Sequence, residues 1–212
     1  MKIKNIKYLV LGTFVLLTLS CAKEDNIVLQ EYNTTILTED FSKLTEIDDN
    51  KPLVYDGWLN FNEIGVKKWT SQFFDGNGYV EFSAFAQALN DKELNNVGWL
   101  ISPKINMDLY EGEKLTFQTA QSFLRLRDNS LELLVSNDFD GTNVNTANWV
   151  NIPIKTAGPD DKRFKYINSN VVDLSSYTGN INFAFKYRGS GTVSNMSGTY
   201  QLDNINVFYP SK

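Results

Sequence analysis

Short runs in which apolar and polar residues alternate with period two are the strongest constraint on the fold. In one such run Leu131, Leu133 and Val135 occupy every second position, with Glu132 and Leu134 between them, and Gly, Asn and Asp separate the runs from one another. This pattern is typical of β-strands that bury one face. It predicts an all-β domain, a two-sheet jelly-roll sandwich of about ten strands. The predicted strands are 34–38, 69–74, 79–86, 99–101, 115–119, 130–136, 149–155, 167–174, 181–187 and 199–209.

The first 20 residues have the pattern of an export signal. Lys2, Lys4 and Lys7 precede the apolar residues 8–19 (YLVLGTFVLLTL), a run too short to cross a bilayer, and Ser20 then precedes the only cysteine. We therefore predict a lipoprotein signal peptide at 1–20, a lipidated Cys21 with a tether at 21–33, and a jelly-roll domain at 34–212. A plain signal peptide followed by an unmodified cysteine is the alternative.

Charge and cysteine content restrict the partners and the sources of stability. The chain carries 20 basic and 25 acidic residues, and removal of the signal would leave 17 basic residues against the same 25 acids. An acidic surface disfavours nucleic acids and anionic lipid, so lipidated Cys21 would be the membrane contact. If Cys21 carries lipid, no disulfide can form within the mature chain, and packing of its many aromatic residues must stabilise the fold.

The chain contains no histidine, which removes the commonest general base and the Ser-His-Asp and Cys-His catalytic arrangements. We therefore predict a protein that is not an enzyme and has no catalytic residues. The alternative is a glycoside hydrolase with a pair of carboxylates. Its candidate acids are Glu81, Glu93, Glu132, Asp160 and Asp161.

Three sequence segments together resemble one family of bacterial surface domains. They are residues 97–106 (VGWLISPKIN), residues 131–141 (LELLVSNDFDG) before Trp149, and strand 181–187 followed by 200–207 (YQLDNINV). These segments are similar to the choice-of-anchor J, or MAM-like, jelly-roll domains, whose fold is galactose-binding-like. The resemblance implies a fold and a surface location, and it implies no activity.

A second short motif bears on location. Lys23, Glu24 and Asp25 follow the predicted lipidation site and resemble the signal that sends some lipoproteins to the outer face of the outer membrane. The alternative is a merely solvated linker.

Calcium is the predicted cofactor. In similar jelly rolls a structural calcium ion joins the first strand to the last, and here Glu39 and Asp40 end the first predicted strand while Asp203 lies in the last. The alternative is that Glu39 and Asp40 form an ordinary turn and Asp203 caps a bulge. We interpret the acidic segment 138–141 (DFDG) as a hairpin turn.

Two tryptophans and two arginines are the candidate ligand-binding residues. Trp58 and Trp69 could stack on sugar rings, and Arg125 and Arg127, which alternate with leucines, predict a cationic strand face. The alternative for Trp58 and Trp69 is packing in the core. We expect that packing role for the other two tryptophans, Trp99 and Trp149.

Together these features predict a lipoprotein anchored in the outer membrane through Cys21 and facing the cell exterior. Its predicted function is that of a non-catalytic carbohydrate-binding or adhesion module, with a glycan as partner. The alternative is an assembly role in which a sheet edge or an exposed face pairs with another surface protein.

Overall fold

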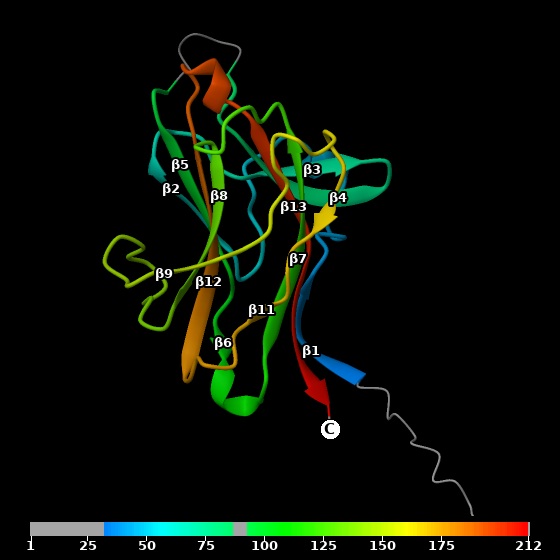
Figure 1. Cartoon of the computed structure of the whole chain (residues 1–212), viewed down its shortest axis with the longest axis vertical. Helices are drawn as coiled ribbons and strands as arrows, with labels where there is room; N and C mark the ends of the chain where they lie inside the picture. Colours follow the sequence, from blue (N-terminus) through cyan, green and yellow to red (C-terminus); the bar gives the residue numbers. More distant parts are fainter. Residues whose placement is uncertain (1–31, 87–92, 212) are drawn as a thin grey trace, which may run out of the picture. The chain divides into compact units, whose positions relative to one another are not determined.

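The computed structural model describes residues 32–86 and 93–211, and these form a sandwich of two antiparallel sheets (Figure 1). The prediction of an all-β fold is confirmed. In the part of the chain described, the only helices are three short 3-10 helices, η1 (Glu46–Asp48), η3 (Met107–Leu109) and η4 (Ser194–Met196). No helix there is long and apolar enough to cross a membrane. Cys21, the predicted signal peptide and nearly all of the predicted tether lie outside the described residues.

The first sheet has seven strands, and the last strand of the chain runs through its middle. Its order is β10-β7-β13-β4-β3, with β1 also paired to β13 and β11 also paired to β7. The strands are β1 (Tyr32–Glu39), β3 (Thr70–Phe74), β4 (Asn77–Ser83), β7 (Lys114–Ser122), β10 (Ile167–Asn168), β11 (Val172–Asp173) and β13 (Thr199–Ser211).

The second sheet has six strands in the order β2-β5-β12-β8-β9, with β6 paired to β12. The strands are β2 (Leu59–Ile64), β5 (Asn96–Ile101), β6 (Ile105–Asn106), β8 (Ser130–Ser136), β9 (Val150–Ile152) and β12 (Asn180–Gly189). In Figure 1 this sheet lies to the left, and the sheet that contains β13 and β7 lies to the right.

Two strands, β2 and the two-residue β6, escaped the sequence analysis. Asn60 and Asn62 make β2 resemble a loop, but the Asn60 side chain replaces a neighbouring strand at this edge. Its Nδ2 donates to the carbonyls of Leu53 at 3.1 Å and Trp69 at 2.8 Å, and its Oδ1 accepts from the Trp69 N–H at 3.1 Å. Two of these bonds give the Leu53 carbonyl and the Trp69 N–H a partner, and the Trp69 carbonyl also accepts from the Leu53 N–H at 2.8 Å.

The predicted strand 167–174 is two short strands, β10 and β11. Between them Ser169 Oγ accepts from the Phe117 N–H at 3.1 Å, and Asn170 Oδ1 accepts from the Lys155 N–H at 2.6 Å. The Ser169 side chain thus replaces a backbone acceptor for β7, and the Asn170 side chain bonds to the segment after β9 instead of to β7.

Aromatic side chains from both sheets meet in the core. Phe82 of β4 stacks on Tyr187 of β12 with ring centroids 4.3 Å apart, and Phe117 of β7 meets Phe185 of β12 edge to face at 4.9 Å. All four side chains are almost completely buried. Buried aromatic pairs contribute their large apolar area and, in addition, about 0.5–1.5 kcal/mol each.

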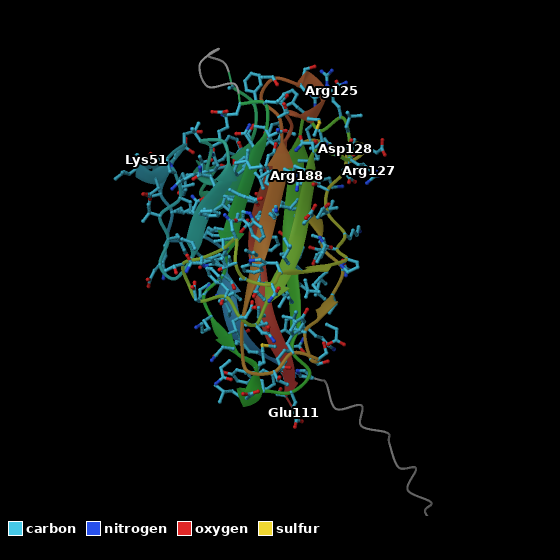
Figure 2. The ribbon with its side chains drawn as sticks, turned by 90° about the vertical axis from the view of Figure 1, so that its left-hand side faces the viewer. Lys51, Glu111, Arg125, Arg127, Asp128 and Arg188 are labelled. Carbon is cyan, nitrogen blue, oxygen red and sulfur yellow. The ribbon has the colours of Figure 1, made fainter. Side chains whose placement is uncertain are left out.

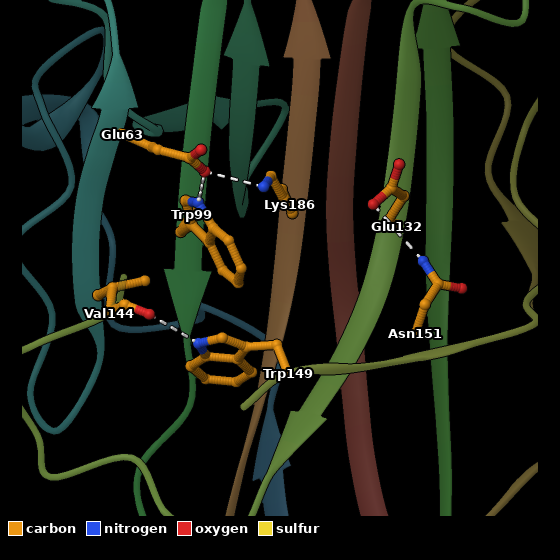
Figure 3. A network of polar contacts seen from close by, with 7 residues as sticks. All are labelled: Glu63, Trp99, Glu132, Val144, Trp149, Asn151 and Lys186. Carbon is orange, nitrogen blue, oxygen red and sulfur yellow. Dashed lines mark hydrogen bonds and ion pairs between the residues drawn. The ribbon is translucent and has the colours of Figure 1, made fainter. Parts of the chain in front are cut away.

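A second, smaller cluster covers the outer face of β5, where Trp99 lies. The loop between β8 and β9 folds back over this face, so the ring of Trp149 lies 5.2 Å from that of Trp99 and 5.5 Å from that of Phe139. Trp149 Nε1 donates to the carbonyl of Val144 at 3.0 Å, as Figure 3 shows. The predicted packing roles of Trp99 and Trp149 are confirmed.

We predict that Gly98→Ala destabilises the fold. A Cβ at position 98 would lie 2.0 Å from Cε2 of Phe82, whose ring is buried between the sheets and cannot move aside freely. Overpacking of this kind costs about 1–3 kcal/mol. Urea unfolding should therefore show a lower midpoint with an unchanged slope.

Gly158→Ala is the matched control, because a Cβ there meets its neighbours at ordinary distances of 3.6 Å and more. We expect its unfolding free energy to stay within about 0.5 kcal/mol of the parent. Equal effects of the two substitutions would contradict the packing argument.

Candidate functional site

The two candidate tryptophans pack against the core. Trp69 is fully buried and meets Phe82 edge to face at 5.7 Å, so it has no face free for a ligand, and the expectation of ligand contact is corrected. Trp58 is half-buried, with its ring 6.2 Å from that of Phe41 and 5.8 Å from that of Phe183. For both residues the structure agrees with the core-packing alternative.

Arg125 and Arg127 are exposed, as a ligand-binding role requires, but they lie in the loop between β7 and β8. The expectation of a cationic strand face is therefore wrong, because both arginines lie on a loop. Strand β7 ends at Ser122 because Phe123 takes a positive φ of 57°, which breaks the extended backbone. The structure does not join the two arginines and the two tryptophans into one site.

The three predicted calcium ligands already accept hydrogen bonds from protein groups. Glu39 Oε1 accepts from the Tyr55 hydroxyl at 2.9 Å, and Asp203 Oδ2 accepts from Asn77 Nδ2 at 3.0 Å. Among the described residues no group of three or more acidic, histidine or cysteine side chains could hold a metal ion. Calcium binding at Glu39, Asp40 and Asp203 stays a prediction, and backbone oxygens would have to complete the site.

The acidic loop at 138–141 closes on itself. Asp140 Oδ1 accepts from the backbone N–H groups of Asn143 at 2.8 Å and Thr142 at 2.7 Å, and Asp138 Oδ1 accepts from the Asn148 N–H at 2.9 Å. The bonds from Asn143 and Thr142 lower the pKa of Asp140. Both carboxylates therefore organise their own loop.

The candidate acids for hydrolysis are distributed over separate elements. Glu81 lies on β4 of the first sheet, Glu132 lies on β8 of the second, and Asp160 and Asp161 lie in the loop before β10. Figure 3 shows Glu132 Oε2 accepting from Asn151 Nδ2 at 3.5 Å on the outer face of the second sheet. Glu81 and Glu132 thus do not form a pair across one cleft.

A groove of about 570 Å³ lies over the outer face of the β3–β4 hairpin. Alternate side chains of a strand point to the same face, and the ladder places Thr70 and Gln72 of β3 beside Glu81 and Tyr79 of β4. The residues before β3 form the remaining wall. The groove is lined by Asn50, Pro52, Val66, Lys67, Lys68, Thr70, Gln72, Glu81 and Ser83.

Hydrogen bonds hold the groove side chains in place. Gln72 Nε2 donates to Thr70 Oγ1 at 3.0 Å and to Asn50 Oδ1 at 3.3 Å, while Lys67 Nζ donates to the carbonyl of Phe85 at 2.7 Å. Lys68 next to it is exposed. The groove therefore presents amide, hydroxyl and ammonium groups that are already oriented.

Glu81 forms the acidic wall of the groove. Gln201 Nε2 of β13 donates to Glu81 Oε2 at 2.9 Å, but burial raises the pKa of Glu81 above its ordinary value of 4.5. Burial likewise raises the pKa of Tyr79 to about 12 and that of Asp203 above its ordinary value. This sheet face thus holds partly dehydrated polar groups, which a bound ligand can contact without displacing much water.

Most groove residues were missed as binding candidates. Their signal was present in the alternation of Thr70 with Gln72 and of Tyr79, Glu81 and Ser83 on either side of a turn. In an antiparallel hairpin such residues share one face.

A family model described as a domain of unknown function (DUF5017) matches residues 104–208. No curated protein sequence matches the chain significantly. The predicted resemblance to choice-of-anchor J domains stays a prediction.

Several solved structures are similar. The K2 cleaved adhesin domain of Lys-gingipain is 15% identical, with 81% of this chain and 96% of that chain covered and a TM-score of 0.52. The K1 domain of Lys-gingipain from Porphyromonas gingivalis W83 is 20% identical, with coverage of 84% and 99% and a TM-score of 0.48. A carbohydrate-binding module with specific mannan recognition is 13% identical, with coverage of 85% and 99% and a TM-score of 0.45. The similarity to the K2 domain supports the sandwich fold.

We predict that Glu81→Gln stabilises the protein at neutral pH. The raised pKa means that the folded state holds a proton more tightly than the unfolded state, so stability falls as the pH rises through and above 4.5. Glutamine mimics the protonated form and can still accept from Gln201. Thermal unfolding should show a Tm higher by on the order of 2–4 °C at neutral pH, with the difference vanishing in acid.

Asp140→Asn is the control of opposite sign. Hydrogen bonds led by that from the Asn143 N–H lower the pKa of Asp140, so its stabilisation is present at neutral pH and is lost in acid. We expect this variant to lower the Tm at neutral pH. A Glu81→Gln variant that behaves in the same way would contradict the assignment of burial as the dominant cause.

Proposed function

We propose that this protein is a non-catalytic carbohydrate-binding or adhesion module whose ligand is a glycan held in the groove on the β3–β4 hairpin. The observation that carries the proposal is a groove of about 570 Å³ lined mainly by hydrogen-bonding side chains. That volume lies within the range of small-ligand sites, about 300–1,000 Å³.

The chemistry of the groove suits a sugar. Exposed Lys68 offers donors, and the side-chain oxygens of Gln72 and Glu81 offer acceptors, so a hydroxyl-rich ring can both accept and donate hydrogen bonds in the groove. Pro52 and the largely exposed Val66 supply apolar surface for the C–H face of the ring. A cleaved adhesin domain with the same sandwich fold agrees with a binding role.

The proposed location is the outer membrane, with Cys21 lipidated and the domain outside the cell. The support is the basic, then apolar segment before Cys21 and the acidic residues that follow it. A membrane anchor would keep a glycan-binding surface at the cell exterior, where polysaccharides are met.

Replacement of groove residues should weaken glycan binding. We expect the full-length chain, purified in detergent, to bind neutral oligosaccharides on a glycan array, and Gln72→Ala or Lys68→Ala to weaken binding by about tenfold each, as loss of a well-placed hydrogen bond does. Affinity would be measured by calorimetry on the best array ligand.

Lys104→Ala is the control, because Lys104 is exposed but lies between β5 and β6, away from the groove residues. It should bind like the parent. If no glycan binds, or if binding is insensitive to Gln72 and Lys68, the groove proposal is wrong, and capture of a surface protein would support the assembly alternative.

Cys21→Ser should release the protein from membranes. Loss of the acyl chains removes about 0.8 kcal/mol of membrane affinity for each buried methylene. Labelling of cells with radioactive palmitate should mark the parent and leave the variant unlabelled, and the variant should move to the aqueous fraction. A variant that stays with the membrane would contradict lipid anchoring.

A further inference from the structure

All four arginines of the chain gather at one end of the sandwich, whereas its 16 lysines are spread along the sequence. Arg125 and Arg127 lie in the β7–β8 loop, and Arg188 lies near the end of β12, where its carbonyl accepts from Asn129 Nδ2 of the same loop at 2.9 Å. Figure 2 shows these three arginines together at the upper end. The fourth, Arg163, lies in the loop before β10.

The β7–β8 loop is held against the domain where it leaves β7. Leu124 is buried, and its N–H donates to Gln121 Oε1 at 3.2 Å. Because Leu124 points inward, the following Arg125 and Arg127 are left exposed. The arginines are thus carried by an anchored segment, which reduces the entropy lost when they bind a ligand.

The loop before β10 docks against this segment. The guanidinium of Arg163 lies 4.2 Å from the ring centroid of Phe123, a cation–π contact, and the Phe164 N–H donates to the Gln121 carbonyl at 2.8 Å. Phe123 is 52% exposed and Phe164 is 59% exposed. Two aromatic side chains therefore remain open to solvent beside the arginines.

The charges of these arginines are not neutralised by ion pairs with described residues. None of the four arginines forms an ion pair with a described residue; an ion pair joins Lys186 to Glu63, and the carboxylate of Asp161 accepts from the Gly158 N–H at 2.8 Å. The two loops, residues 123–129 and 153–166, hold six basic residues and three acidic ones, in a chain whose net charge is −5. This end is therefore a local basic surface on an acidic protein.

We propose that Arg125, Arg127 and Arg163, together with Phe123 and Phe164, form an arginine surface that binds anionic polysaccharide, a sugar chain that bears carboxylate or sulfate groups. Guanidinium groups bind such oxyanions through paired hydrogen bonds, and exposed aromatic faces stack on sugar rings. The acidic remainder of the protein repels the same polymer, which directs it to this end. The surface shares no residue with the groove on the β3–β4 hairpin, and it is a second site that stands without the first.

The test measures retention of the full-length chain in detergent by immobilised heparin, which is sulfated, and by polygalacturonate, which is carboxylated. We expect binding to at least one polymer, lost at high salt. Arg125→Gln combined with Arg127→Gln should weaken it by about tenfold or more, and Arg163→Gln should weaken it as well. Which polymer binds identifies the anion.

Three controls test whether the arginine surface itself retains the polymer. Lys104→Gln removes one exposed charge elsewhere and should bind like the parent. Phe123→Ala should weaken binding to polysaccharide, and poly-glutamate or anionic vesicles should be retained less than either polysaccharide. Because the side chains of the arginine surface are exposed, unchanged Tm values would show that the variants are folded.

Several results would overturn the proposal. They are no retention by either polymer, equal losses in the Lys104→Gln and arginine variants, or tighter binding of poly-glutamate or vesicles. Gln72→Ala should leave heparin and polygalacturonate binding unchanged, and the arginine variants should leave neutral glycan binding unchanged, so failure of one site is distinguishable from failure of the other.

Discussion

The stack of Phe82 on Tyr187 is the contact on which the sandwich depends, because it joins a strand of each sheet at the centre of the core. Gly98 leaves room for the Phe82 ring, since any Cβ there would overlap it. The buried Tyr187 hydroxyl donates to the Gly198 carbonyl at 2.6 Å and accepts from the Ala84 N–H at 3.1 Å, so its polar end is satisfied. One side chain thus combines apolar packing with two hydrogen bonds that tie the segments after β4 and before β13 together.

Aromatic rings fill the space between the two sheets, so a ligand can bind only on the outer faces of the sheets or on the loops. The outer face of the first sheet carries the groove and its half-buried Glu81, while that of the second is closed over Trp99 by the β8–β9 loop. Lys186 extends over the Trp99 ring and pairs with Glu63 at 2.8 Å, which completes that closure with charge (Figure 3). The first sheet and the arginine-bearing loops therefore offer the accessible polar surface.

Strands with clear alternation were predictable, and those held by side-chain bonds were not. Strand β8 was predicted at its observed bounds because Leu131, Leu133 and Val135 occupy every second position of the run. Strand β2 was missed because its outer edge has no neighbouring strand. The side chain of Asn60, within β2, instead bonds to the backbone of Leu53 and Trp69, a role that no local pattern reveals. Of the candidate ligand residues, Arg125 and Arg127 are exposed, whereas Trp69 is buried, and an isolated tryptophan carries no sequence signal that distinguishes these fates.

The sequence by itself determined the all-β class, the absence of histidine chemistry, the acidic balance and the export-like beginning, because composition and period two are local properties. The tertiary structure decided which polar residues share a face. Glu81 meets Gln201, and Arg163 meets Phe123, only because strands and loops far apart in the chain become neighbours. Such proximity depends on strand order and register, which are set by how the whole core packs and cannot be read from any one segment.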